Sequence, residues 1–254
     1  MAVGSMDELL RLVDVSKGYT RGDRWHAVLH DVSLRVGPRE VVAVVGSRYE
    51  GKTTLLRIAA GFEHPDRGEV WVGGQELSKA SEKVRAVVRG SAMAWVHRGG
   101  SAVPLRVMDA VGLPLATGRK HGRREVRRLA AAALDRVGVP DCGRQHWADL
   151  SNWERVLVAL ARGIVGRPTL MLVDDLLDGL GPWRTQQAAE LLTSVVDELG
   201  CGVLMSVSDM EGALAADRVL TFEQGHLRVI AGPPESNVVD LSGRRHEGRT
   251  ERSA

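Results

Sequence analysis

The chain has 254 residues, of which 44% are hydrophobic and 26% are charged, and its formal net charge is only +2. These values are ordinary for a globular protein and exclude the strong overall field typical of nucleic-acid-binding or membrane-surface proteins. No apolar run reaches the roughly 18–20 residues of a membrane span, and the first residues lack a signal-peptide pattern. Cys142 and Cys201 stand far apart and outside any Cys/His cluster, so neither a zinc site nor a disulfide framework is expected. We therefore expect a cytosolic protein without a nucleic-acid partner.

The beginning of the chain predicts two strands. Leu9–Val15 and Val28–Val36 alternate or cluster their apolar residues as strands do. The stretch 17–24 between them is rich in turn residues and is expected to be a loop. Gly37-Pro38 then separates these strands from the next apolar run.

The stretch 41–57, VVAVVGSRYEGKTTLLR, combines a buried strand, a loop and a helix start, and contains the P-loop pattern G-x-x-x-x-G-K-[ST]. Backbone N–H groups at a helix start carry partial positive charge and suit phosphate oxygens. Lys52 is expected to reach the β- and γ-phosphates of a nucleotide, and the Thr53 hydroxyl to hold Mg²⁺. A chance match on an ordinary strand–turn–helix is the alternative, and the correct flanks count against it. The predicted nucleotide-binding residues of this loop are Gly46, Ser47, Arg48, Tyr49, Glu50, Gly51, Lys52, Thr53 and Thr54.

The middle of the chain is predicted to be mostly helical. The helix that starts at Lys52 is expected to end near Gly61, and Glu69–Val72 to form a strand that leads into a Gly-Gly turn. From about 78 to 164 the pattern becomes helical. One predicted helix has the apolar face Val126, Leu129, Ala130, Ala133, Leu134 and Val137. It also carries a basic cluster, for which we favour a solvated face over a contact with an acidic partner; its members are Arg123, Arg124, Arg127 and Arg128.

Strands and helices alternate again in the last third of the chain. Thr169–Val173 is an apolar strand that ends in Asp174-Asp175, and 183–199 is predicted to be a helix. Gly202–Val207 predicts another strand, and 218–230 predicts a hairpin that turns at its Gln-Gly pair. Together these elements predict an α/β domain with a helical insertion.

Two motifs in this part of the chain carry a family resemblance. Residues 150–164 read LSNWERVLVALARGI, and RPTLMLVDDLLDGLG follows after a short gap. This arrangement resembles the nucleotide-binding subunit of an ABC transporter, whose LSGGQ signature leads a helix ending in an Ala-Arg pair, here Ala161-Arg162, before a Walker B strand. The stretches LRVMDAVGLPL at 105–115 and LDRVG at 134–138 are most similar to the lipoprotein-releasing and macrolide-export class. The similarity covers about residues 8–231.

The resemblance implies the fold and the domain organisation. It implies an α/β P-loop NTPase core of the ABC ATPase type, with an antiparallel β subdomain and an inserted α-helical subdomain. A single domain is expected over 1–235, with the helical subdomain at about 90–165. Residues 236–254 are polar, have little to bury and are expected to form a disordered tail.

The resemblance also implies a mechanism. Two subunits would close around two ATP molecules, each held by the P-loop of one subunit and the signature of the other, and hydrolysis would reopen them to drive a membrane partner. ATP and Mg²⁺ are the implied cofactors. The implied partners are a membrane-spanning permease and a second ABC ATPase subunit, identical or different, at the cytoplasmic face of the cell membrane. The signature residues that would meet the partner's ATP are Leu150, Ser151, Asn152, Trp153 and Glu154.

Carried over position by position, the resemblance assigns further roles around the nucleotide. Tyr19 matches the aromatic residue that stacks on adenine, and a surface turn tyrosine is the alternative. Asp174 would bind Mg²⁺ together with Thr53. Gly181 stands where the family has the aspartate that ends the D-loop, which removes a contact between subunits.

Three positions matched to catalytic residues differ from the family pattern. Asp175 occupies the place of the catalytic glutamate and is one methylene shorter, which withdraws the base by about 1 Å and can cost on the order of 10²-fold in rate. His97 stands where the family has the glutamine that senses Mg²⁺ and the attacking water, and imidazole is shorter and differently shaped. Ser208 replaces the histidine that contacts the γ-phosphate, and much of that contact is lost.

The phosphate-facing loops depart from the pattern as well. Asn152 and Trp153 replace both signature glycines, and Glu154 replaces the glutamine. Tyr49 replaces a P-loop glycine, and Glu50 places a carboxylate beside the β-phosphate region. Glycine lets backbone N–H groups approach phosphate closely, whereas a side chain crowds that approach. We therefore expect Trp153 either to swing aside or to block the approach of the partner's nucleotide.

Three functions follow from these features. The first is an ATP-binding ABC subunit whose own hydrolysis is weak or absent, acting in a heterodimer or as a regulatory partner. The second is a fully active transport ATPase that powers export or lipoprotein release, with Asp175 as its base. The third is a scaffold that keeps the fold without using nucleotide, a hypothesis opposed by the retention of Lys52, Thr53 and Asp174.

Overall fold

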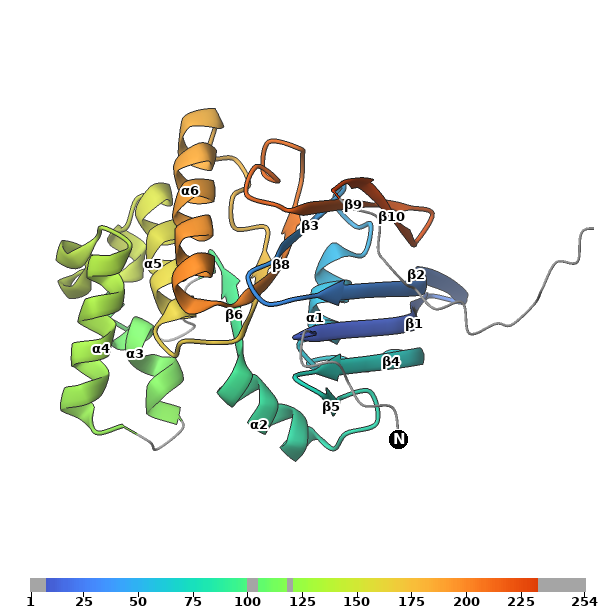
Figure 1. Cartoon of the computed structure of the whole chain (residues 1–254), viewed down its shortest axis with the longest axis horizontal. Coiled ribbons are helices and arrows are strands. Elements are labelled where there is room, and N and C mark those ends of the chain that lie inside the picture. Colours follow the sequence, from blue (N-terminus) through green and yellow to red (C-terminus); the bar gives the residue numbers. More distant parts are fainter. Residues whose placement is uncertain (1–7, 100–104, 118–120, 233–254) are drawn as a thin grey trace, which may run out of the picture.

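The computed structural model describes residues 8–99, 105–117 and 121–232. The polar tail expected at 236–254 lies outside these residues. Figure 1 shows an antiparallel sheet on one side of the molecule and a group of helices on the opposite side, with several strands of a second sheet between them.

The strands form two sheets. A four-stranded antiparallel sheet has the order β2-β1-β4-β5, and a six-stranded sheet has the order β10-β9-β3-β8-β7-β6. In the larger sheet β9, β3, β8, β7 and β6 are parallel, and β10 is antiparallel to β9. The strands of the first sheet are β1 (Leu10–Arg21), β2 (Arg24–Val36), β4 (Arg67–Val72) and β5 (Gln75–Glu76). Those of the second are β3 (Val41–Val45), β6 (Met93–His97), β7 (Leu170–Asp174), β8 (Gly202–Val207), β9 (Arg218–Glu223) and β10 (His226–Ala231).

Both faces of the larger sheet are covered, which explains its continuous apolar strands. Side chains alternate between the faces of a strand. Val41 and Ala43 of β3 therefore belong to one core cluster, whereas Val42 and Val44 belong to a second cluster that the antiparallel sheet helps to form. A strand with both faces buried needs apolar residues at every position, as VVAVV has. This strand runs directly into the P-loop.

The helices are arranged around the larger sheet. They are α1 (Lys52–Ala59), α2 (Glu82–Ala92), α3 (Val107–Thr117), α4 (Arg123–Arg136), α5 (Asn152–Ile164) and α6 (Pro182–Leu199), with short 3₁₀ turns at Pro140–Arg144 and Trp147–Asp149. In Figure 1, α3, α4 and α5 gather on the side away from the antiparallel sheet. The helix expected to begin near 183, the strand at Gly202–Val207 and the hairpin that turns at Gln224-Gly225 are confirmed.

The prediction of a loop at 17–24 is wrong, because two strands extend into this stretch. β1 continues to Arg21 and β2 begins at Arg24, so that Gly18 pairs with Ala27 and Tyr19 pairs with His26. The residues of β2 in this part are exposed, so the apolar alternation that marks a strand in the sequence is missing although the ladder of backbone hydrogen bonds continues. A register shift between Lys17 and Gly18 accommodates the irregular sequence.

The helical stretch expected from 78 to 164 also contains a strand. β6 (Met93–His97) pairs in parallel with β7 and forms an edge of the larger sheet. The sequence Met-Ala-Trp-Val is a short apolar run, and such a run does not distinguish a strand from a helix by periodicity alone. The helices of the inserted region therefore begin after this strand, with α3.

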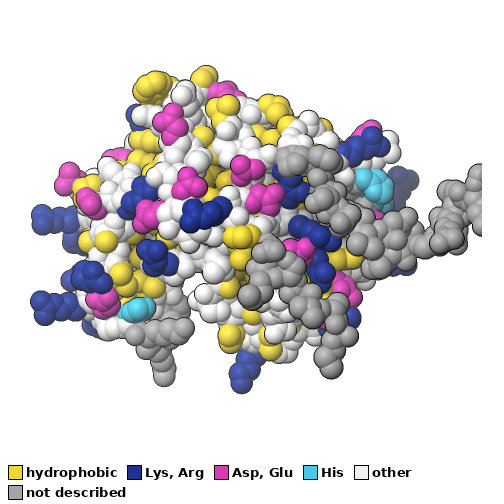
Figure 2. Space-filling view, viewed as in Figure 1, with side chains coloured by type: hydrophobic (Ala, Val, Ile, Leu, Met, Phe, Trp, Pro, Cys, Tyr) yellow, Lys and Arg dark blue, Asp and Glu magenta, His cyan; other side chains and the backbone are white. Residues whose placement is uncertain are grey.

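The basic cluster of α4 faces solvent. Arg123, Arg124, Arg127 and Arg128 are exposed, while Ala130, Ala133 and Leu134 of the same helix are buried. Figure 2 shows Lys and Arg side chains projecting from the flank of the molecule where α4 lies. Arg128 pairs with Glu125 at 2.7 Å on this surface. Among the described residues, no helix is both long and apolar enough to cross a membrane.

Candidate functional site

The candidate site lies where the parallel strands of the larger sheet end. β3 leads into the P-loop, β7 ends at Asp174, and β8 ends one residue before Ser208. Because parallel strands place their carboxyl ends at one edge, these segments meet there, as in other open α/β sheets. A pocket of about 510 Å³ opens at this edge. It is lined by Tyr19, Val28, Ser47, Arg48, Tyr49, Gly51, Lys52, Thr53, Thr54, Arg98, Asp175 and Asp178.

The P-loop surrounds a buried lysine. Lys52 is only 5% exposed, and its Nζ donates to the carbonyl oxygens of Gly46, at 2.5 Å, and Ser47, at 3.0 Å. Gly51 has a φ of 99°, and a Cβ there would lie 2.7 Å from Cγ1 of Val28. Only glycine meets both demands without strain. The loop is thus shaped to hold an ammonium group at the start of α1.

Tyr49 and Glu50 give the P-loop two features that its sequence pattern does not predict. Tyr49 has a φ of 72° and is 92% exposed, so it occupies a glycine-like backbone conformation with its ring in solvent. The Glu50 carboxylate folds back over the loop, and its Oε2 accepts a hydrogen bond of 2.8 Å from the backbone N–H of Ser47. The carboxylate therefore lies inside the loop that the pattern assigns to phosphate.

The side chains of Thr53 and Asp174, which the sequence assigned to Mg²⁺, contact each other. Thr53 Oγ1 donates to Asp174 Oδ1 at 3.0 Å. These are hard oxygen ligands, which Mg²⁺ prefers, so the donor set fits that ion. If Mg²⁺ is bound with a nucleotide, it supplies charge neutralisation of the phosphates. The structure brings together the two residues that the sequence assigned to the metal.

Ser206 connects the two aspartates and was not found from the sequence. Its side chain is completely buried, and its Oγ lies 2.9 Å from Asp174 Oδ1 and 3.0 Å from Asp175 Oδ1. The backbone N–H of Asp175 donates to Ser206 Oγ at 2.9 Å. The sequence signal that could have revealed Ser206 is a hydroxyl within the otherwise apolar strand GVLMSV, since a buried polar group needs hydrogen-bond partners.

The pKa of Asp175 is raised above its ordinary value. Burial is the main cause, and the nearby carboxylates of Asp178 and Asp174 add to it, whereas Lys52 and the hydrogen bond from Ser206 oppose it. A raised pKa makes a carboxylate a better proton acceptor when it is ionised. Asp175 also has a φ of 43°, a sparsely populated conformation for a residue with a side chain.

His97 lies beside Asp174 at the end of β6, opposite it in the ladder with β7. Its Nδ1 accepts a hydrogen bond from the backbone N–H of Gly99 at 2.9 Å. The pKa of His97 lies below its ordinary value, first because of burial and then because of the Arg162 cation, while Asp174 opposes the shift. These effects favour the neutral imidazole, and one of its nitrogens is already engaged.

Ser208 and Gly181 occupy the remaining positions assigned from the sequence. Ser208 Oγ donates to Asp178 Oδ2 at 2.7 Å, so this hydroxyl is held by a neighbour that also lines the pocket. Gly181 caps the N-terminus of α6 with a φ of 75° and has open space around it. Asp178 is a second residue that the sequence reasoning missed, and its position shortly after the Walker B strand was the available signal.

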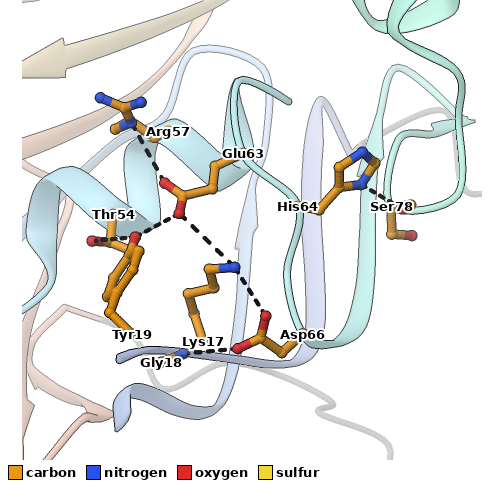
Figure 3. A network of polar contacts seen from close by, with 9 residues as sticks. All are labelled: Lys17, Gly18, Tyr19, Thr54, Arg57, Glu63, His64, Asp66 and Ser78. Carbon is orange, nitrogen blue, oxygen red and sulfur yellow. Dashed lines mark hydrogen bonds and ion pairs between the residues drawn. The ribbon is translucent and has the colours of Figure 1, made fainter. Parts of the chain in front are cut away.

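Tyr19 is anchored by a polar network at the edge of the pocket (Figure 3). Its hydroxyl donates to Glu63 Oε1 at 2.7 Å and lies 3.4 Å from Thr54 Oγ1. Lys17, whose ammonium lies 5.6 Å from the Tyr19 ring centroid, pairs with Asp66 at 2.9 Å. Burial raises the pKa of Tyr19, the largest of several effects. Tyr19 is thus a fixed, half-buried residue that lines the pocket.

The five predicted signature residues lie at the start of α5, and none of them lines this pocket. Ser151 caps the helix. The backbone N–H of Glu154 donates to its Oγ at 3.3 Å, and Glu154 Oε2 accepts from Ser151 N at 2.8 Å and from Ser151 Oγ at 2.6 Å. These bonds lower the pKa of Glu154. Leu150 is buried and Asn152 is exposed.

Trp153 lies to one side of this helix start. It packs against the core cluster of the helical region, and the guanidinium of Arg184 lies 4.7 Å from its ring centroid. Such a cation–π contact holds the indole against the beginning of α6. Trp153 is thus half-buried against its own chain, and its swinging aside or blocking the partner's nucleotide stays a prediction.

Comparisons with known proteins identify the family of this chain. A family model described as ABC transporter matches residues 29–177. The chain belongs to the ABC transporter family. The lipoprotein-releasing system ATP-binding protein LolD of Pseudomonas fluorescens is 34% identical over 223 residues, which cover 87% of this chain and 98% of that protein. LolD of Anaplasma marginale is also 34% identical over 223 residues, covering 87% and 99%. The likeness is therefore to the ATP-binding subunits of the family.

Solved structures share the fold. A dimeric post-hydrolysis state of the ATP-binding cassette MJ0796, bound to ADP and Pi, superposes with a TM-score of 0.80 at 23% identity, covering 88% of this chain and 99% of that one. CbiO1 of Clostridium perfringens, part of the transporter complex CbiONQ, gives a TM-score of 0.75 at 23% identity, covering 87% of each chain. These likenesses confirm the predicted P-loop fold with its antiparallel β subdomain.

Proposed function

We propose that this chain is the ATP-binding subunit of an ABC-type membrane transporter, that it binds Mg-ATP, and that it hydrolyses ATP weakly. The observation that carries this proposal is a contrast between two groups of residues at the same edge of the larger sheet. The lysine, threonine and aspartate that hold phosphate and metal are in place, whereas the groups assigned to hydrolysis are shortened or already bound to protein neighbours. We take residues 1–235 as one nucleotide-binding domain.

Nucleotide binding is supported by the P-loop and its neighbours. Lys52 sits at the start of α1, and its two carbonyl partners are loop atoms that it can exchange for phosphate oxygens. Thr53 and Asp174 offer adjacent oxygens to Mg²⁺. Tyr19 lines the same pocket and supplies an aromatic face to the adenine.

Weak hydrolysis is supported by three side chains. Asp175 offers a carboxylate that is one methylene shorter than glutamate, and Ser206 lies 3.0 Å from it. Ser208 is short and is bound to Asp178, so it cannot extend to a γ-phosphate as a histidine would. The pKa of His97 is lowered by burial, and its Nδ1 already accepts a hydrogen bond from the Gly99 N–H. Positioning errors of about 1 Å cost on the order of 10²-fold in rate, so the combined effect is large.

The partners follow from the family. We propose that two ATP-binding subunits pair head to tail and dock on a membrane-spanning permease at the inner face of the cell membrane. Pairing with a different subunit that has complete motifs suits this chain, because such a partner would supply the missing glycines to its P-loop site. The family's role in lipoprotein release, taken from the names of LolD relatives, supports the alternative of an active export ATPase. A scaffold without nucleotide is the least supported function, because Lys52 remains buried in the loop.

Binding and turnover of the purified full chain test this proposal. Isothermal titration with Mg-ATP should show binding that Lys52→Ala weakens, and steady-state hydrolysis should be far below that of a LolD relative measured alongside. The restored variant Asp175→Glu/Ser208→His should hydrolyse faster, and adding Trp153→Gly should raise the rate again in the paired state. Turnover equal to that of the relative would show an active ATPase, and absence of binding at millimolar ATP would favour the scaffold.

A further inference from the structure

Two tetrapeptides in this chain repeat one pattern. Residues 47–50 read Ser-Arg-Tyr-Glu and residues 151–154 read Ser-Asn-Trp-Glu, so each has a serine, an aromatic residue two positions later and a glutamate at the fourth position. The first lies in the P-loop just before α1, and the second starts α5. Both are the loops that the proposed function assigns to phosphate.

The two glutamates adopt the same contact. In each tetrapeptide, Oε2 of the glutamate accepts a hydrogen bond of 2.8 Å from the backbone N–H of the serine three residues earlier. At α5 the serine side chain takes part as well, which makes a complete helix cap. At α1 no side-chain cap forms, and the serine hydroxyl makes no hydrogen bond to any described residue. The Glu50 contact therefore does not belong to a helix cap.

The Glu50 carboxylate lies close to the backbone of the P-loop. A Cβ built on Gly46 would overlap Glu50 Oε2 and would lie 3.7 Å from Cδ of Lys52, so the carboxylate covers Gly46 beside the lysine stem. Backbone N–H groups of this loop are the groups that cradle phosphate in the P-loop pattern. A carboxylate and a phosphate oxygen are both anionic acceptors and compete for the same donor.

We propose that Glu50 is an internal anion of the P-loop, which occupies the Ser47 N–H and must leave before the phosphates of a nucleotide can enter. This inference rests on the proposed ATP-binding function and names a regulator of that site. Entry of a polyanion has to break the Ser47–Glu50 hydrogen bond and to move one negative charge away from the bound phosphates. Tyr49, which is exposed and has a positive φ, forms the bend that brings the carboxylate back over the loop.

Glu50→Gln is the variant that separates charge from shape. Glutamine keeps an oxygen that can accept the Ser47 hydrogen bond but removes the negative charge. We expect Glu50→Gln to bind Mg-ATP at least tenfold more tightly than the natural chain, which corresponds to about 1.4 kcal/mol. The ratio of the two dissociation constants should shrink as salt is raised, because screening weakens the repulsion between carboxylate and phosphate. A purely structural role of Glu50 predicts neither effect.

The measurement uses the full chain and a fluorescent ATP analogue with Mg²⁺, titrated at low and at moderate salt. Glu190→Gln is the matched control, because Glu190 is an exposed glutamate of α6 whose hydrogen bond is with Gln186 of the same helix and not with the P-loop. Detectable binding only in Glu50→Gln would also support the inference. Equal affinities of Glu50→Gln and the natural chain, with Lys52→Ala weaker than both, would overturn the inference and leave ATP binding intact. Absence of binding by both chains would overturn the inference together with the proposed function.

Discussion

The starts of α1 and α5 differ in how their first backbone N–H groups are capped. Each must satisfy the free N–H groups that every helix leaves at its first turn. At α5 the chain uses side chains, since Ser151 and Glu154 exchange hydrogen bonds in a capping box. At α1 no side chain caps the helix, and the N-cap residue Gly51, with a φ of 99°, supplies no side-chain acceptor. The similar tetrapeptides before them therefore differ in purpose: one stabilises a helix, and the other leaves its helix start available to a ligand.

This contrast explains why a glutamate has different consequences in the two places. Glu154 is part of a cap and stabilises the folded chain without a nucleotide. Glu50 bonds to Ser47 in a loop whose helix gains nothing from that bond. The first glutamate contributes to stability, and the second acts on ligand affinity.

The largest expected effect on stability comes from Gly51→Ala. The substitution forces a side chain into a left-handed conformation and places its Cβ 2.7 Å from Val28, so α1 loses the backbone on which its start depends. We expect the free energy of unfolding to fall by about 1–3 kcal/mol in a urea titration. Gly122→Ala is the control, because Gly122 precedes α4 with a φ of −74° and has open space around it. Equal losses from both variants would break the proposed contrast.

Ser151→Ala and Ser47→Ala form a matched pair with a smaller effect. Removing the Ser151 hydroxyl deletes the cap of α5 and should lower the free energy of unfolding by about 1 kcal/mol. Removing the Ser47 hydroxyl leaves the Glu50 contact intact, because that contact uses the backbone N–H, and should change stability by less than about 0.5 kcal/mol. Differential scanning calorimetry of both variants without nucleotide measures the difference. A Ser47→Ala chain as unstable as Ser151→Ala would show that the P-loop tetrapeptide is a cap after all.

Much of this site could be read from the sequence, and the missing parts have physical reasons. The P-loop and Thr53 follow from a motif whose spacing fixes their neighbourhood along one strand–loop–helix unit, and Asp174 follows from the family resemblance of the strand that it ends. The hydrogen bonds of Ser206 and Asp178 depend instead on which strands lie side by side, and the β3-β8-β7 order is set by tertiary packing. The strand β6 was missed for a related reason, because its short apolar run suits a strand or a helix and its pairing with β7 decides between them. The direction of the Glu50 carboxylate follows from the bend at Tyr49, which no periodicity reveals.

The smallest expected effect is on the pH dependence of stability, and it tests the contribution of the Glu154 charge. Its pKa in the folded chain is lowered from 4.5 by the hydrogen bonds from the Ser151 hydroxyl and backbone N–H. A carboxyl whose pKa is lower when folded contributes stability above its unfolded pKa, and that contribution is lost as pH falls through the folded value. The natural chain should therefore lose more stability than Glu154→Gln between about pH 5 and pH 3, because glutamine keeps the cap and does not titrate. Thermal melts of both chains across this range measure the difference. Parallel pH profiles would mean that the Glu154 charge adds nothing to the cap, and the two tetrapeptides would then differ only in their serines.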